Sequence, residues 1–289
     1  MSLGTRKLTA LFQGQSPKVK YHNGTLLSGN IPINLYWYGS FTPAQRSIII
    51  DFIASLSSPP LQGQPSVAKW WSTINNYYAL AQPNNAGTTT LSLSLGNQIL
   101  DNSYSLGKSL TRDQIQQLAS KGAQNNAIVV VLTSADVSVE RFCLDSCGTH
   151  GSENNKLVYI WVGNSQTLCP GLCAWPFHQP ISGPQNPPLV PPNGDVGCDG
   201  MVINLASLLA GAITNPYGNG VYQGQAEAPL EAASACPGDF GKDAYPGFPG
   251  NLLVDPTSGG CYNAVGANGR KFLVPALFDP STSSCSTLV

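Results

Sequence analysis

The placement of the cysteines constrains this chain more than any other feature. All eight cysteines lie between Cys143 and Cys285, and the first 142 residues contain none. Four of them form two C-x3-C pairs, Cys143/Cys147 and Cys169/Cys173. An even number of closely spaced cysteines indicates disulfides made in an oxidising compartment. The alternative is a zinc site held by four thiolates, but the turn-rich and charge-poor surroundings favour disulfides.

The charge of the chain excludes some partners. Only 10% of the residues are charged and the formal net charge is −1, whereas binding to nucleic acid needs a concentrated Lys/Arg surface. No apolar run of 18 residues is present, so we expect no membrane span. Residues 1–5 have the character of an expression remnant in place of a cleaved signal peptide. The sequon Asn23-Gly24-Thr25 predicts N-glycosylation at Asn23, as in a secreted glycoprotein.

The hydrophobic pattern predicts an α/β or α+β fold with a mixed central sheet and flanking helices. Residues 31–38, 88–95, 127–132 and 157–162 have the pattern of strands, and two of these runs are apolar enough to be buried on both faces. Helices are expected after Thr42-Pro43, from Pro65-Ser66, after Thr111 and over 201–213. We expect one domain over 6–289, with a cysteine-free part (6–142) and an irregular, disulfide-rich part (143–289). The Pro-rich stretch 180–197 is expected to be a functional loop or a linker.

Few residues can carry chemistry. His150 and His178 each follow a close cysteine pair, so disulfides could bring both into one region. With Asp195 or Asp199 as a third ligand, they would form a zinc site of a hydrolase. The alternative is that each histidine hydrogen-bonds a loop backbone. The sequence has no Gly-x-Ser-x-Gly elbow for a nucleophilic serine.

Other candidate groups have simpler explanations. Glu227 and Glu231 are expected to be solvated or to cap a helix, and Asp239 and Asp243 lie in a Gly-rich loop that could hold calcium without EF-hand spacing. Trp70, Trp71 and Trp175 could stack on sugars, but rings at helical spacing usually pack into the core.

Several long motifs together resemble one family of plant proteins, the EXORDIUM or phosphate-induced family. The resemblance extends from about Arg6 to Val289. It implies a protein secreted to the apoplast and cell wall and connected with growth, and it brings no agreed catalytic reaction. The motifs are YHNGTLLSGNIPINLYWYGSFTPAQRSIIIDFIASLS, PSVAKWWSTINNYY, CGTHGS, YIWVGNS, CPGLCAWPFHQP, DGMVINLASLLAGAITNPYGNGVYQG and LVPALFDPSTSSCSTL.

A more distant resemblance is to secreted zincin-like peptidases. In those proteins, an apolar helix before a Thr-Asp-Pro-like stop carries His-Glu and a further zinc ligand one turn later. Here the corresponding positions hold Ser207, Leu208 and Gly211, none of which can bind zinc or act as a general base. The resemblance therefore implies a zincin-like scaffold that has lost its metal, although a plain core helix would look the same.

Together these observations predict a non-catalytic extracellular protein that binds a wall glycan, a peptide or a receptor. A hydrolase with a relocated site near His150 and His178, and a carbohydrate-binding module, remain the alternatives. No cofactor is expected. Zinc and calcium are the two ions for which the sequence offers candidate ligands. The expected disulfides are nested, Cys143–Cys173 and Cys147–Cys169, together with Cys198–Cys261 and Cys236–Cys285.

Overall fold

A five-stranded mixed sheet forms the centre of the molecule. The computed structural model describes residues 17–59, 63–81, 89–124 and 126–289. The strand order is β3-β2-β5-β8-β7; the first four strands are parallel, and β7 pairs antiparallel with β8 at the edge. These strands are β2 (Gly29–Tyr38), β3 (Leu91–Asp101), β5 (Ile128–Thr133), β7 (Gly148–Glu153) and β8 (Leu157–Gly163). The predicted mixed α/β architecture is therefore confirmed.

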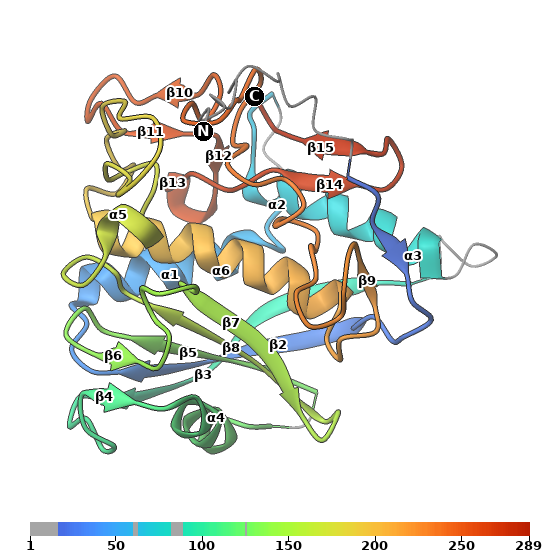
Figure 1. Cartoon of the computed structure of the whole chain (residues 1–289), viewed down its shortest axis with the longest axis vertical. Coiled ribbons are helices and arrows are strands. Elements are labelled where there is room, and N and C mark those ends of the chain that lie inside the picture. Colours follow the sequence, from blue (N-terminus) through green and yellow to red (C-terminus); the bar gives the residue numbers. More distant parts are fainter. Residues whose placement is uncertain (1–16, 60–62, 82–88, 125) are drawn as a thin grey trace, which may run out of the picture.

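Helices cover both faces of this sheet. Figure 1 shows α1 and α6 on one side and α4 on the other. The helices are α1 (Pro43–Ser55), α2 (Val67–Trp71), α3 (Asn75–Ala81), α4 (Arg112–Lys121), α5 (Pro170–Cys173) and α6 (Val196–Thr214), with 3-10 turns at Ser72–Ile74 and Ala267–Gly269. The helix expected from Pro65 is thus divided into two short helices joined by a 3-10 turn.

Successive side chains of the central strands point to opposite faces of the sheet and pack into two separate hydrophobic cores. Val130 and Leu132 of β5 pack with α1 and α6, whereas Val129 and Val131 pack with α4. All four are fully buried, as expected for strands covered on both faces. The helix starts follow the sequence signals: Thr42 and Thr111 each form a capping box, with Gln45 and Gln114 respectively.

Short hairpins and irregular segments follow α6, beyond the helix as seen from the sheet (Figure 1). The remaining strands are β1 (Lys20–Tyr21), β4 (Ser109–Leu110), β6 (Ser138–Val139), β9 (Val221–Tyr222), β10 (Leu253–Val254), β11 (Cys261–Tyr262), β12 (Ala264–Val265), β13 (Lys271–Phe272), β14 (Leu277–Asp279) and β15 (Ser284–Ser286). The predicted strand over 88–95 begins instead at Leu91, and its first residue lies outside the described residues, as do residues 1–5.

The α6 helix is the central element of the core. Within the described part of the chain, it is the one helix long and apolar enough to cross a membrane, but most of it is buried inside the protein. It packs against β7, β8 and α1, and it ends at Thr214, two residues before Pro216, as the sequence predicts. These contacts place the C-terminal half of α6 beside the open edge of the sheet.

Candidate functional site

The open edge of the sheet borders a cavity of about 700 Å³. The β7 strand forms one wall, α6 supplies Ser207 and Leu208, and the chain after α6 closes the far side. We call this cavity the edge groove. Its lining consists of Asp145, Gly148–Ser152, Ser207, Leu208, Asn215–Gly218, Ala226, Glu227, Pro229, Glu231 and Ser234.

A histidine, a glutamate and an asparagine from three segments meet at the base of the edge groove. The Nε2 atom of His150 on β7 lies 2.8 Å from Oε2 of Glu231. The other carboxylate oxygen of Glu231 accepts a hydrogen bond of 2.7 Å from the Asn215 side chain. The Asn215 oxygen in turn accepts from the Gly220 backbone. Both members of the His150–Glu231 pair are largely buried, with side chains 13% and 11% exposed.

Gly211 makes room for this network. A Cβ atom at position 211 would lie 2.3 Å from Oε2 of Glu231 and 2.9 Å from Nε2 of His150. A Cβ atom does not approach other heavy atoms so closely, so only glycine fits without displacing the pair. The zincin-like resemblance would put a further zinc ligand at position 211. The space that a side chain would need there is filled by the Glu231 carboxylate.

Among the described residues that line the edge groove, Ser207 is not paired with a general base. The Ser207 hydroxyl donates to the Ile203 carbonyl of its own helix rather than to a base. Leu208 is apolar. The Nδ1 atom of His150 is buried and has no hydrogen-bond partner among the described residues.

The residues present do not fit a zinc ion. Within the described residues, no group of three His, Cys, Asp or Glu side chains is placed to hold a metal. Ser207, Leu208 and Gly211 offer no usable ligands, and the Glu231 carboxylate is held by two other side chains. The zincin-like origin of the scaffold stays a prediction.

The expected convergence of His150 and His178 is not seen. His178 is exposed, lines a different cavity and has its Nδ1 atom 2.9 Å from the Gln179 carbonyl, as the backbone-bonding alternative predicts. Asp195 caps α6 through the Cys198 amide and accepts from Gln45. Asp199 is buried and accepts two hydrogen bonds from Asn193, while burial raises its pKa to about 7. Both aspartates therefore have structural roles in α6.

Sequence reasoning missed Glu231, which was expected to be solvated or to cap a helix. It is buried, whereas Glu227 is exposed as expected. The available signal was its position in the order apolar helix, Thr-Asn-Pro, then Glu-x-x-x-x-Cys. The calcium idea finds no support either, because the Asp243 carboxylate accepts from Asn251 and no third acidic residue joins it and Asp239 in the described chain.

Comparison with known proteins identifies the family. The description "Phosphate-induced protein 1 conserved region" matches residues 19–288. The chain belongs to this family. It is 62% identical to Protein PHOSPHATE-INDUCED 1 of Nicotiana tabacum, over 99% of this chain and 93% of that protein. It is 62% identical to Protein EXORDIUM of Arabidopsis thaliana, over 100% and 95% of the two chains. Protein EXORDIUM-like 1 of the same plant is 59% identical over 93% and 89%. No solved structure matches the chain.

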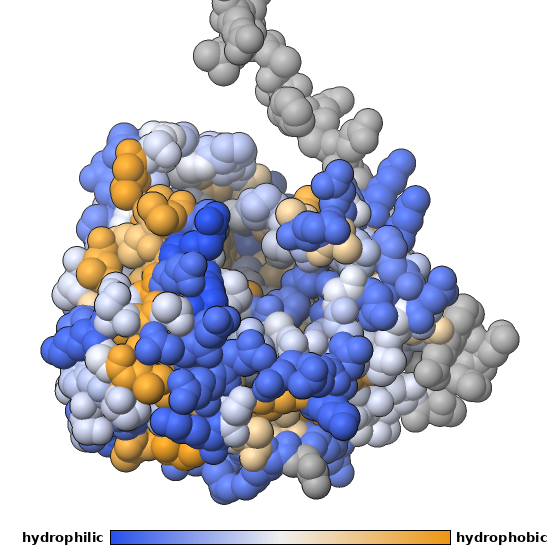
Figure 2. Space-filling view, turned by 60° about the horizontal axis from the view of Figure 1, so that its bottom comes forward, coloured by the Kyte–Doolittle hydropathy of each residue, from blue (hydrophilic) through white to orange (hydrophobic). Residues whose placement is uncertain are grey.

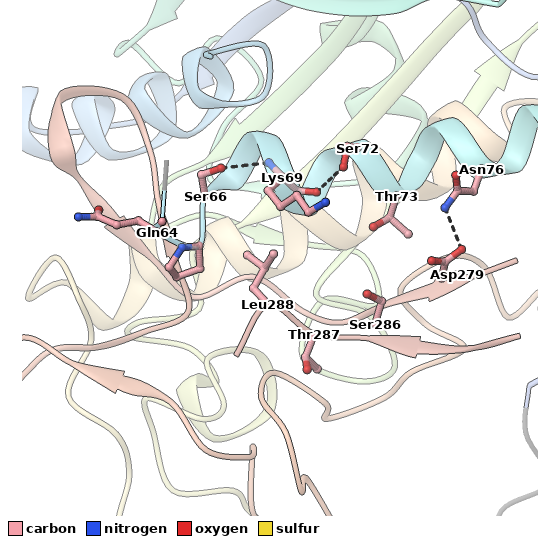
Figure 3. A pocket seen from close by; sticks show the side chains of 12 residues that line it. Gln64, Ser66, Lys69, Ser72, Thr73, Asn76, Asp279, Ser286, Thr287 and Leu288 are labelled. Atoms are coloured by element: carbon pink, nitrogen blue, oxygen red, sulfur yellow. Dashed lines mark hydrogen bonds between the residues drawn. The ribbon is translucent and has the colours of Figure 1, made fainter. Parts of the chain in front are cut away.

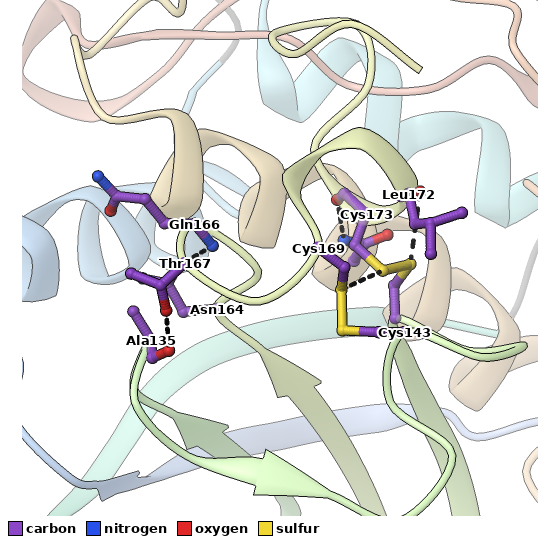
Figure 4. The surroundings of a disulfide bond; sticks show 10 residues. Ala135, Cys143, Asn164, Gln166, Thr167, Cys169, Leu172 and Cys173 are labelled. Carbon is purple, nitrogen blue, oxygen red and sulfur yellow. Dashed lines mark hydrogen bonds between the residues drawn. A yellow bond between two sulfur atoms is a disulfide. The ribbon is translucent and has the colours of Figure 1, made fainter. Parts of the chain in front are cut away.

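In this member of the phosphate-induced family, two disulfides tie the segment before β7 to α5 (Figure 4). They join Cys143 to Cys169 and Cys147 to Cys173. The nested pairing expected from the sequence is therefore wrong. Both segments space their cysteines by four residues, so either order could close. The order follows from the relative direction of the two segments, which the sequence does not reveal.

The remaining cysteines behave in two ways. Cys236–Cys285 forms as expected. Cys198 and Cys261 are not bonded to each other, because Cys198 is buried in the main core on α6 whereas Cys261 lies on β11 and lines a separate cavity. Burial also raises the pKa of the Cys198 thiol, so this side chain stays protonated at neutral pH.

The tryptophan pair does not form a sugar-stacking surface. Trp70 and Trp71 are 3% and 6% exposed and belong to the main core, and the Trp70 indole donates to the Pro275 carbonyl. Trp175 is partly exposed and lines a cavity of about 430 Å³ together with His178, Tyr245, Phe248 and the Pro-rich loop. We call this the Pro-rich cavity. The predicted loop over 180–197 thus forms one of its walls before entering α6.

A third cavity is lined by polar side chains and lies between α2 and the C-terminal hairpin (Figure 3). Its volume is about 600 Å³. Several of its polar groups are already paired: Ser66 accepts from the Lys69 backbone, and Asn76 donates to Asp279. These bonds are those of helix capping and hairpin docking.

One face of the molecule is mostly polar. Figure 2 shows the face that α4 covers, where hydrophilic residues predominate and hydrophobic ones gather toward one side. Exposed Asn23, in the left-handed region at φ 65°, is accessible for the predicted glycosylation. Its glycosylation stays a prediction.

Proposed function

We propose that this protein is a secreted, non-catalytic protein of the apoplast and cell wall that influences plant growth by binding a ligand in the edge groove. The observation that carries the proposal is the paired state of His150, Glu231 and Asn215. A general base must be free to reach a substrate proton, and a metal ligand must direct a lone pair at the ion. Here both oxygens of Glu231 are engaged inside the protein.

Secretion is supported by the covalent structure. Three disulfides are formed, and such bonds persist in oxidising compartments. The relatives named above are plant proteins. The apoplast and the cell wall are the oxidising surroundings that a plant protein meets after secretion.

The edge groove suits binding for two reasons. Its volume of about 700 Å³ is within the range of ligand sites. Its lining also combines apolar Leu208 with the exposed carboxylate of Glu227. The hydrolase alternative is less well supported because His150 and His178 line different cavities. Of the three tryptophans in the carbohydrate-binding alternative, only Trp175 is partly exposed, whereas Trp70 and Trp71 are buried.

The proposal is tested by filling the groove. Ser207→Trp puts a large ring into the edge groove from a partly exposed position, and Ser207→Ala is the matched control. Arabidopsis plants in which EXORDIUM is disrupted would receive either variant or the unchanged protein. We expect the unchanged protein and Ser207→Ala to restore growth and Ser207→Trp to fail, although all three are secreted in equal amounts. Full rescue by Ser207→Trp would contradict the proposal.

A further inference from the structure

In the part of the chain that the structure describes, β7 is the last strand of the sheet and pairs with no strand on its outer side. Gly163 donates to the Cys147 carbonyl, and the register pairs Thr149 with Trp161 and Gly151 with Tyr159. Hydrogen-bonded and non-hydrogen-bonded residues alternate in an antiparallel pair. Gly148, His150 and Ser152 therefore direct their main-chain N–H and C=O groups away from β8. Within the described chain, no hydrogen bond to these groups comes from outside the strand pair.

These free main-chain groups border the edge groove, since Gly148, His150 and Ser152 all line it. Proteins usually protect an exposed strand edge with proline, lysine or a covering segment. The sequence of β7, GTHGSE, contains neither proline nor lysine. All six residues are only half-buried, so the edge remains reachable. An added strand would complete the ladder of the sheet.

The charges of the edge groove favour a basic ligand. Its lining includes Asp145, Glu227 and Glu231 but no lysine or arginine. Asp145 is paired with Arg141, and Glu231 with His150. Glu227 is exposed and forms no ion pair among the described residues. One acidic side chain thus remains to attract a lysine or arginine of the ligand.

We propose that the ligand of the edge groove is an extended peptide segment carrying a basic residue, which adds to the sheet as a strand beside β7. Main-chain hydrogen bonds to Gly148, His150 and Ser152 supply affinity, as in other cases of strand addition. Glu227 supplies the preference for a basic side chain. This inference rests on the function proposed above and names the ligand class for the same site.

The test uses a library of random 12-residue peptides displayed on phage and selected against the secreted, disulfide-bonded protein. The edge is blocked by Ser152→Pro, which removes an outward N–H group without touching the ladder to β8. Ser152→Ala keeps this N–H group and is the matched control. Glu227→Lys, on an exposed loop, reverses the attracting charge without changing the strand.

We expect peptides enriched in lysine or arginine. Their affinity should fall about tenfold with Ser152→Pro, which corresponds to the loss of one main-chain hydrogen bond, and should not change with Ser152→Ala. Glu227→Lys should lower the affinity for the same peptides several-fold. Slower amide hydrogen exchange over residues 148–152 in the peptide complex would place the peptide on β7.

Three outcomes would overturn the inference. The first is that no peptide is selected, and the second is that the selected peptides bind Ser152→Pro as tightly as the wild type. The third is that the wild-type protein is a dimer in gel filtration and Ser152→Pro is a monomer, because the strand beside β7 would then come from a second copy of the chain. If any of these occurs while Ser207→Trp still abolishes growth rescue, the proposed function stands and only the peptide is excluded. Full rescue by Ser207→Trp would remove the proposed function itself.

Discussion

Replacing Glu231 by alanine is expected to lower the free energy of unfolding by about 3–5 kcal/mol. The substitution leaves His150 buried without its carboxylate partner and removes the acceptor of the Asn215 amide. Unpaired buried groups lose their hydration without compensation, which is the source of the cost. Urea unfolding followed by tryptophan fluorescence would measure it.

The matched control is Glu227→Ala, which truncates an exposed carboxylate four residues earlier and should change stability by no more than about 0.5 kcal/mol. Gly211→Ala adds a second test. Helix propensity alone predicts a gain of about 1 kcal/mol. The clash of the new Cβ with Glu231 and His150 predicts a net loss instead. A stabilised Gly211→Ala protein, or a loss below about 1 kcal/mol for Glu231→Ala, would show that the network is not structural.

Loss of the Cys236–Cys285 disulfide should be nearly as costly. The bridge spans 49 residues, and closing a loop of that length stabilises a fold by about 4 kcal/mol in the chain-entropy account. It links the C-terminal hairpin of β14 and β15 to the segment that carries Glu231, which the Phe278 amide also contacts through the Ala232 carbonyl. We therefore expect the double variant Cys236→Ala/Cys285→Ala to unfold at markedly lower urea concentration.

Cys261→Ala is the control for that experiment, because Cys261 is partly exposed and unbonded. Its effect should stay below about 1 kcal/mol. Equal unfolding midpoints for the double variant and the wild type would contradict the assigned bridge. A large loss for Cys261→Ala would instead contradict the free state of Cys261 and indicate that this thiol is paired in the secreted protein.

Much of the sheet and of its helices could be predicted because local signals agree with the fold. The N-cap Thr42 followed by Pro43, the apolar run in β5 and the proline after α6 each place an element correctly. The β7 strand could not be predicted in this way. Its sequence, GTHGSE, lacks apolar and β-branched alternation because an edge strand buries little of either face.

The candidate site was harder to predict because long-range packing assembles it. His150 was recognised, but its partner is 81 residues away and had looked like a solvated loop glutamate. Apart from the Glu-x-x-x-x-Cys spacing to Cys236, nothing local distinguishes Glu231 from Glu227, since burial depends on how the chain after α6 folds back. The order of the paired cysteines is unpredictable for the same reason, because it depends on the direction of two segments relative to each other.

The central claim is that the edge groove binds a ligand and is neither a metal centre nor a catalytic site. The most direct measurement is the metal content, by plasma mass spectrometry, of protein made through a secretory pathway and never exposed to a chelating resin. The paired state of His150 and Glu231 predicts no transition metal in stoichiometric amount. One zinc ion per chain would contradict the account and would make His150 and Glu231 the first residues to examine as ligands.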